Sequence, residues 1–410
     1  MKPAFGCKLL GAHQALTGIR DGVVLFHSVV GCNFGSMAFH FAACHMTDVR
    51  QTCTVISDRE VVFGGENSLE KALKGVRELY EPSVVFVVTG CVSDIIQDDV
   101  KRIAAAFERE HALRVIPMEA AGYRGSFQDG FEQALRILAG EMELPEKLRL
   151  SERGKISGRE PVRIPVLNIL GIGADDPRAE ADLEALEGLL NGKARIGTVF
   201  SHTDMEGVRC ASGADLNLVF GCGAELAGEM ERRFGIPYEQ LDYPYGLTGA
   251  EKLWDCLEHR FGLQFTEEKK AFETATAEGV KGAYSYLQAL YGLPVSILGT
   301  GARAAGLAEF LSGELGMEIE VCARRESVKD LEDFYDQVRR TETAFLFGSS
   351  FEQELADELE IPLLRFDFPV FDRVCLTRRP YIGAEGTLCL IEDLLQEALA
   401  ARSLKGAMYQ

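Results

Sequence analysis

The chain has 410 residues and a formal net charge of −20 at pH 7, from 63 acidic against 43 basic side chains. This charge disfavours nucleic-acid binding, which needs clustered lysine and arginine, and no apolar run approaches the roughly 20 residues that span a bilayer. A hydrophobic content of 47% and a charged content of 26% are ordinary for a soluble globular protein. At this length, two or three domains are expected rather than one core.

The first third of the chain contains three cysteines at abrupt breaks in the pattern. Cys7 precedes a short helix predicted over residues 9–19. Cys32 follows a predicted strand over residues 22–28, and Cys91 follows one over residues 83–90. Both runs are short, apolar and β-branched, which is typical of buried parallel strands. Ligands usually bind at the carboxyl ends of such strands, so thiolates at these positions are able to bind one shared ligand.

Three interpretations of these cysteines remain open from the residues alone. They can fill space in the core, form disulfides or bind metal. The cysteine count of 11 is odd, and the run M-K-P-A-F-G-C does not have the form of a signal peptide. We therefore expect a reducing, cytoplasmic compartment with free or metal-bound thiols. The chain has no C-x-x-C pair, so the compact zinc and ferredoxin signatures are absent.

The rest of the first third alternates between helix and strand. Helices are predicted over residues 67–80, from about residues 93–94 onward, and over residues 128–138, with a strand at 113–118 between the last two. These elements indicate an N-terminal α/β domain over residues 1–160 that carries the cluster cysteines. Cys44, with His40 and His45 beside it, is the best candidate for an additional ligand, although such a stretch is more often core packing.

Two further α/β units follow, predicted over residues 161–290 and 291–410. The second is expected to end in a long helix over residues 267–290, and the third in a helix from about Glu385. Gly299, Gly301 and Ala304 approximate a dinucleotide fingerprint, but a lone fingerprint is weak and we expect a tight strand-to-helix turn without nucleotide. The fold class predicted from this alternation is α/β, with three Rossmann-like domains built on parallel β-sheets.

Four stretches together resemble the nitrogenase component 1 family: C-K-L-L-G-A-H-Q-A-L-T-G-I from Cys7, L-F-H-S-V-V-G-C up to Cys32, V-V-F-G-G-E-N-S-L-E-K-A-L, and V-V-T-G-C-V-S-D-I-I-Q-D-D-V around Cys91. The spacing of the cysteines is more similar to the β-type subunit than to the α-type. The resemblance covers nearly the whole chain. It implies that Cys7, Cys32 and Cys91 bind iron of a P-cluster-like or [4Fe-4S] iron–sulfur cluster at a subunit interface. For His27, at the end of its predicted strand, two roles stay open: a donor to a cluster sulfur or a cap of the strand end.

In the α-type subunits of this family, one cysteine and one histidine hold the large cofactor. The corresponding cysteine here is Cys222, one residue out of register, and Ile382 stands where the histidine is expected. An aliphatic side chain cannot bind iron. The resemblance therefore predicts that this chain does not hold a nitrogenase-type cofactor in the usual manner, and Cys222 remains either a ligand or a buried strand-end thiol.

The resemblance implies an iron–sulfur subunit of a nitrogenase-like, ATP-dependent reductase, which relays electrons from an iron protein to a substrate-reduction site near a subunit interface. Its expected partners are an α-like homologous subunit or a second copy of itself, and an ATP-hydrolysing iron protein, since this chain has no G-x-x-x-x-G-K-[ST] loop. The alternative is a scaffold subunit for assembly of a nitrogenase-type cofactor. The substrate is left open, and no catalytic residue is assigned.

Overall fold

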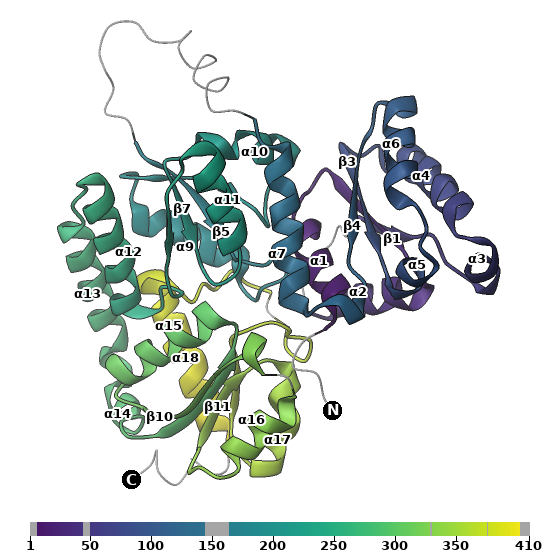
Figure 1. Cartoon of the computed structure of the whole chain (residues 1–410). Coiled ribbons are helices and arrows are strands. Elements are labelled where there is room, and N and C mark those ends of the chain that lie inside the picture. Colours follow the sequence, from purple (N-terminus) through teal and green to yellow (C-terminus); the bar gives the residue numbers. More distant parts are fainter. Residues whose placement is uncertain (1–5, 44–49, 144–163, 329, 375, 402–410) are drawn as a thin grey trace, which may run out of the picture.

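The computed structural model describes residues 6–43, 50–143, 164–328, 330–374 and 376–401, with the backbone only for residues 39–43. These residues form three four-stranded sheets, and the strand pairs in each sheet are parallel (Figure 1). Each sheet has the strand order 2-1-3-4 within its own unit. Because the chain leaves the first and third strands toward opposite edges, a crevice opens between the carboxyl ends of these two neighbours.

The first sheet has the order β2-β1-β3-β4 and contains β1 (Gly22–His27), β2 (Gln51–Cys53), β3 (Val84–Thr89) and β4 (Arg114–Glu119). Every residue of β1 and β3 is buried, because helices cover both faces of the sheet. Leu69 of α4 (Glu66–Tyr80) and Phe107 of α6 (Val100–His111) pack on one face. Leu9 of α1 (Lys8–Thr17) and Phe131 of α7 (Phe127–Leu138) belong to the core on the other face. Continuous burial on both faces explains why these strands are apolar runs without alternation.

The other two sheets repeat this plan. The second contains β5 (Val166–Leu170), β6 (Arg195–Val199), β7 (Leu216–Val219) and β8 (Tyr238–Gln240), and the third contains β9 (Pro294–Gly299), β10 (Glu318–Arg324), β11 (Phe345–Gly348) and β12 (Leu363–Arg365). The predicted fold class, α/β with three Rossmann-like units on parallel sheets, is confirmed. The division at residues 160/161 and 290/291 stays a prediction, and the first boundary lies outside the described residues.

The α-helices in the described ranges are α1 (Lys8–Thr17), α2 (Val30–Ala43), α3 (Asp58–Phe63), α4 (Glu66–Tyr80), α5 (Cys91–Ile96), α6 (Val100–His111), α7 (Phe127–Leu138), α9 (Ala179–Leu190), α10 (Met205–Cys210), α11 (Ala224–Phe234), α12 (Gly246–Phe261), α13 (Thr266–Val280), α14 (Tyr284–Gln288), α15 (Gly301–Gly313), α16 (Leu331–Val338), α17 (Gln353–Leu359) and α18 (Gly383–Ala400). Two differ from the prediction. The helix expected from residues 93–94 starts at Cys91, with Gly90 as its N-cap. The helix expected over 267–290 is divided by the 3-10 turn Lys281–Ala283, where Gly279 and Gly282 lower helix propensity.

Helices α1 and α7 cross with their backbones in direct contact (Figure 1). A side-chain carbon on Gly130 of α7 would sit 1.9 Å from the carbonyl oxygen of Lys8, and one on Gly11 of α1 would sit 1.8 Å from that of Phe127. Neither carbonyl is able to move without disturbing its own helix. Glycine at both positions therefore fixes the approach of α1, the helix that Cys7 caps.

We expect Gly130→Ala to destabilise the protein by roughly 3 kcal/mol or more, the upper part of the range for overpacking, because its methyl group would overlap backbone rather than a mobile side chain. Gly188→Ala is the matched control, because nothing lies within 4 Å of a side-chain carbon at that helical position. Thermal melts of the two variants measure the difference. Equal melting temperatures would show that the α1–α7 contact adjusts at little cost.

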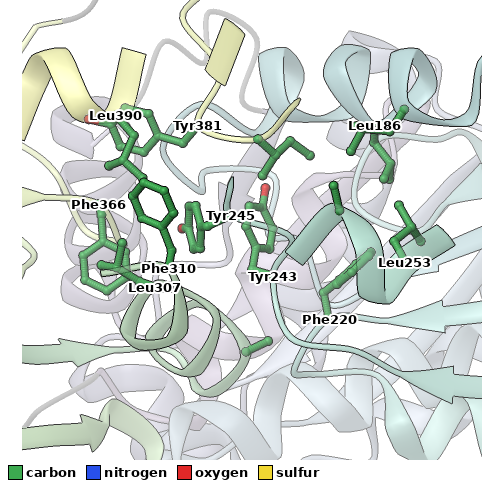
Figure 2. Packing of buried hydrophobic residues seen from close by; sticks show 14 of the residues in the cluster. Leu186, Phe220, Tyr243, Tyr245, Leu253, Leu307, Phe310, Phe366, Tyr381 and Leu390 are labelled. Atoms are coloured by element: carbon green, nitrogen blue, oxygen red, sulfur yellow. The ribbon is translucent and has the colours of Figure 1, made fainter. Parts of the chain in front are cut away.

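The second and third units meet around a buried ionic group. Arg303 of α15 lies over the ring of Tyr243, with its guanidinium carbon 4.0 Å from the ring centroid, and donates to the hydroxyl of Tyr243 at 3.1 Å. That hydroxyl donates to Asp182 of α9 at 2.7 Å. Figure 2 shows Tyr243 and Tyr245 between the aromatic and aliphatic side chains of both units, with Phe310 beside Tyr245. A buried cation with aromatic and carboxylate partners thus joins the two units.

Candidate functional site at the crevice of the first sheet

Cys32 and Cys91 lie at the two sides of the crevice in the first sheet. Cys32 is in the first turn of α2, after β1, and Cys91 is the first residue of α5, after β3. These two strands pair in register up to His27 and Thr89. The first sheet therefore brings the two predicted site residues to neighbouring strand ends, at the point where its topology changes direction.

Cys7 joins this crevice from α1. It is the N-cap of that helix and forms an isolated antiparallel bridge with Ser126. The sulfurs of Cys7 and Cys91 each lie 3.5 Å from the point where a side-chain carbon on Gly122 would sit, so they are at most twice that distance apart. A side chain at Gly122 would occupy the space between the two sulfurs, and its first carbon would also lie 3.0 Å from Cβ of Cys7.

Two of the three thiols receive hydrogen bonds. The hydroxyl of Ser28 donates to the sulfur of Cys32 at 3.2 Å, and the backbone N–H of Gly122 donates to the sulfur of Cys91 at 3.2 Å. Donors of this kind stabilise negative charge on a ligating thiolate. Ser28 also lies against Gly90, where a side-chain carbon would be 2.0 Å from the hydroxyl oxygen. The glycine before Cys91 therefore makes room for the donor to Cys32.

The thiols of the crevice suit one kind of metal centre better than another. Among the described residues, no three His, Cys, Asp or Glu side chains are grouped so that they could hold one metal ion. A polynuclear cluster is different, because each thiolate binds a separate iron. Three thiols around one crevice, N–H and O–H donors to sulfur, and a glycine, Gly122, beside two of the sulfurs fit a cluster better than a mononuclear site.

The hydrogen-bond partners that the structure shows for the ring of His27 are Asp98 and Thr54, neither of them a cysteine. Its Nε2 lies 2.8 Å from a carboxylate oxygen of Asp98, and its Nδ1 lies 3.1 Å from the hydroxyl of Thr54. Burial lowers the pKa of His27, although its hydrogen bond to Asp98 works in the opposite direction. Asp98 also accepts the N–H of Gly65 at 2.9 Å. His27 and Asp98 together therefore link the end of β1 to the segments that follow β2, α3 and α5.

Cys53 was missed by the sequence analysis because β2, with three residues, gave no clear apolar pattern. It ends that strand and lies opposite Phe26 of β1. Its thiol donates to the carbonyl of Ser28 at 3.3 Å and accepts the N–H of Val55 at 3.3 Å. Burial raises the pKa of the Cys53 thiol. Cys53 is thus a neutral thiol with two backbone partners, close to the site.

The other positions singled out in the sequence are Cys44, Cys222 and Ile382. Cys44 is outside the described residues, as is His45, and the side chain of His40 is not described. Cys222 follows β7 in the second unit, where burial raises the pKa of its thiol well above the ordinary range. Ile382 is buried at the N-terminus of α18.

The glycine-rich turn after β9 is occupied by acidic side chains. Thr300 donates both its N–H and its hydroxyl to Asp367. A side-chain carbon at Gly301 would lie 2.4 Å from a carboxylate oxygen of Glu326. Carboxylates stand where a pyrophosphate would bind, which favours the interpretation as a tight strand-to-helix turn over a dinucleotide site.

Comparison with known proteins decides the family. The model of the nitrogenase component 1 type oxidoreductases matches residues 7–399. The chain belongs to this family. The crevice between β1 and β3 thus lies in a nitrogenase component 1-like fold, and the predicted resemblance is confirmed.

Similar proteins include both enzyme subunits and an assembly protein. The nitrogenase molybdenum-iron protein beta chain of Methanococcus maripaludis is 24% identical over 97% of this chain and 94% of its own length. The nitrogenase iron-molybdenum cofactor biosynthesis protein NifE of Methanosarcina barkeri is 29% identical, over 57% of this chain and 50% of its own length. A solved structure, "Nitrogenase Cp1 at pH 6.5", superposes with a TM-score of 0.77 at 19% identity, covering 99% of this chain and 93% of that one. None of the described helices is long and apolar enough to cross a membrane.

Proposed function

We propose that this protein is the iron–sulfur subunit of a nitrogenase-like, ATP-dependent reductase and that it corresponds to the β-type subunit. The observation that carries the proposal is the placement of Cys7, Cys32 and Cys91 around one crevice, at the N-termini of α1, α2 and α5. Membership in a family of oxidoreductases and the full-length similarity to two β chains support it. An iron–sulfur cluster bound there would supply one-electron transfer between an iron protein and a reduction site.

The protein's own groups would hold and tune that cluster. Cys7, Cys32 and Cys91 supply the thiolates. The hydroxyl of Ser28 and the N–H of Gly122 donate to two of the sulfurs and so bias the potential by stabilising the more negative state. The three helix N-termini add positive partial charge on the same side.

A second subunit is expected to cover the surface around the cysteine crevice. Large apolar side chains next to the cysteines are exposed to solvent, with Phe34 at 68%, Ile95 at 68% and Tyr123 at 59%. Exposed apolar groups gathered on one face typically mark a protein interface. The partner that we propose is an α-like homologous subunit or a second copy of this chain, which would also supply the ligands that three cysteines leave missing. The electrons would come from a separate ATP-hydrolysing iron protein.

A scaffold subunit for cofactor assembly is the second candidate function. The similarity to NifE over 57% of this chain supports it. The presence of all three cysteines favours the reductase, because an electron-relaying cluster needs permanent thiolate ligands. Ile382, with no metal-binding atom, argues against retention of a large cofactor by this chain in the α-type manner.

The first experiment is anaerobic purification of the chain, alone and together with a candidate α-like partner, followed by iron and sulfide analysis. We expect about four irons per chain or more, and a paramagnetic signal after dithionite reduction. Electron delivery by an iron protein with ATP then separates the reductase from the scaffold. A protein without iron or sulfide in both preparations would overturn the proposed function.

A further inference from the structure

A cavity of about 940 Å³ lies where the three units meet, away from the cysteine crevice. Its lining comes from the last turn of α1, the starts of β1 and β2, the loop after β5, the segment after β12 and the last third of α18. Helix α1 separates the cavity from the cysteine crevice, because Cys7 caps its first turn and Leu16 and Thr17 of its last turn line the cavity. Ten helical residues span about 15 Å.

The cavity concentrates positive charge in an acidic protein. Its lining contains seven arginines against four carboxylates, whereas the whole chain has 63 acidic and 43 basic side chains. The arginines are Arg20, Arg50, Arg178, Arg365, Arg373, Arg378 and Arg379. A cavity lined with one sign of charge attracts ligands of the opposite sign, and arginine is the residue best suited to carboxylate and phosphate groups.

Most of these arginines already have close carboxylate partners. Arg178 lies 2.9 Å from Asp393, and Arg373 lies 2.9 Å from Glu397. Arg365 pairs with Asp372, Arg378 with Glu184, and Arg379 with Glu392 and Asp393. These five arginines therefore form part of the cavity wall, and carboxylates of the protein largely compensate their charge.

Arg20 and Arg50 differ from the other five. The ion pair that the structure shows for Arg20 joins it to Asp204 at 3.9 Å, with 72% of the arginine side chain exposed. Arg50 donates to the carbonyl of Tyr80 at 2.6 Å and lies over that residue's ring. Arg20 precedes β1 and Arg50 precedes β2, and these strands are parallel neighbours. Both guanidinium groups therefore arise from the same edge of the first sheet.

Beside the arginines, the four carboxylates and a few uncharged polar residues, the lining contains a group of apolar side chains. Leu16, Ile19, Val24 and Leu364 are buried, and Val370, Val374 and Leu376 extend the apolar wall. A volume of this size holds an organic molecule rather than a simple anion such as phosphate. Among the described residues, Arg20 has a carboxylate only at 3.9 Å and Arg50 forms no ion pair. Two such arginines next to an apolar wall fit a molecule with an apolar body and two acidic groups.

We propose that this cavity binds an amphiphilic organic dianion. Its acidic groups pair with Arg20 and Arg50, and its body packs on the apolar wall formed by α1 and the segment after β12. The site uses none of the cysteines. Its occupancy is therefore independent of the proposed iron–sulfur function, and either proposal can fail without the other.

The test uses the full chain and two fluorescent probes, bis-anilinonaphthalene disulfonate as the amphiphilic dianion and N-phenyl-1-naphthylamine as an uncharged aromatic molecule. We expect the dianion to bind with one-to-one stoichiometry, and the Arg20→Gln/Arg50→Gln variant to weaken it about tenfold or more, which corresponds to about 1.4 kcal/mol. The affinity for the uncharged probe should change little. Arg232→Gln is the control, because Arg232 lies on the surface of α11 outside the cavity lining.

Ala174→Phe provides a second, independent arm, because Ala174 lines the cavity and a phenyl ring there would fill part of it. This variant should weaken both probes. Circular dichroism checks that each variant is folded. Unchanged dianion affinity in the double arginine variant, or in Ala174→Phe, would overturn the proposal, because binding would then occur at another surface.

Discussion

Cys91→Ala is expected to abolish iron binding while leaving the fold intact. Its sulfur is one of three proposed ligands, and a cluster that loses one of them lacks a thiolate at one iron. The chain itself should tolerate the change, because Cys91 is only partly buried and opens α5, where alanine is a good helix former. The N–H of Gly122, which donates to this sulfur, lies at a partly buried position where water is able to replace the bond.

Cys53→Ala is the matched control for this experiment. Its thiol lies at the same edge of the same sheet, but it is bonded to the carbonyl of Ser28 and the N–H of Val55. We expect the Cys53→Ala protein to keep the iron content of the wild type, and the Cys91→Ala protein to fall to background. Iron and sulfide analysis beside circular dichroism measures both. Full iron content in Cys91→Ala would remove that residue from the ligand set, whereas loss of iron in Cys53→Ala would add a fourth thiol to it.

The architecture was predictable because two signals agree along the chain. Buried parallel strands such as β1 and β3 are continuous apolar runs, and the glycines after them mark where the backbone turns. A crevice between such strands follows from the topology alone, which is why the sequence predicts that Cys32 and Cys91 lie at strand ends, and the structure shows both after the neighbouring strands β1 and β3. The short strands β2, β8 and β12 have three residues each and carry too little pattern to be recognised.

The missed parts of the site depend on contacts between distant segments. Gly122 follows β4, which pairs with β3 and so brings it near Cys91, and it reaches Cys7 because α1 and α7 pack together. Ser28 is the last residue of a predicted strand, but nothing in its neighbours shows that its hydroxyl points toward Cys32. The residues that line the arginine cavity are still further apart in the sequence, because the segment after β12 is separated from Arg20 and Arg50 by most of the chain. Spacing along the sequence predicts none of these contacts.

Glu352→Ala is expected to destabilise the third unit by about 3–5 kcal/mol, the range for removing one partner of a buried ion pair. Arg325 and Glu352 have fully buried side chains, and two parallel hydrogen bonds of 3.1 and 2.6 Å join them. Glu352 also accepts the N–H of Ser349 at 2.6 Å. Its removal would deprive the buried guanidinium group of Arg325 of the carboxylate that forms two hydrogen bonds with it, and would free the turn that follows β11.

Hydrogen exchange of peptides from β9 and β11 measures this effect in the third unit, where a global melt of a multi-domain chain would not isolate it. Glu358→Ala is the matched control, because Glu358 makes a similar two-bond pair with Arg339 at the surface. That exposed pair should contribute about 1 kcal/mol or less. A double variant, Arg325→Met/Glu352→Leu, should recover much of the loss, because an apolar pair leaves no buried charge. If the single and double variants were equally unstable, packing around Glu352 rather than its charge would hold the unit together.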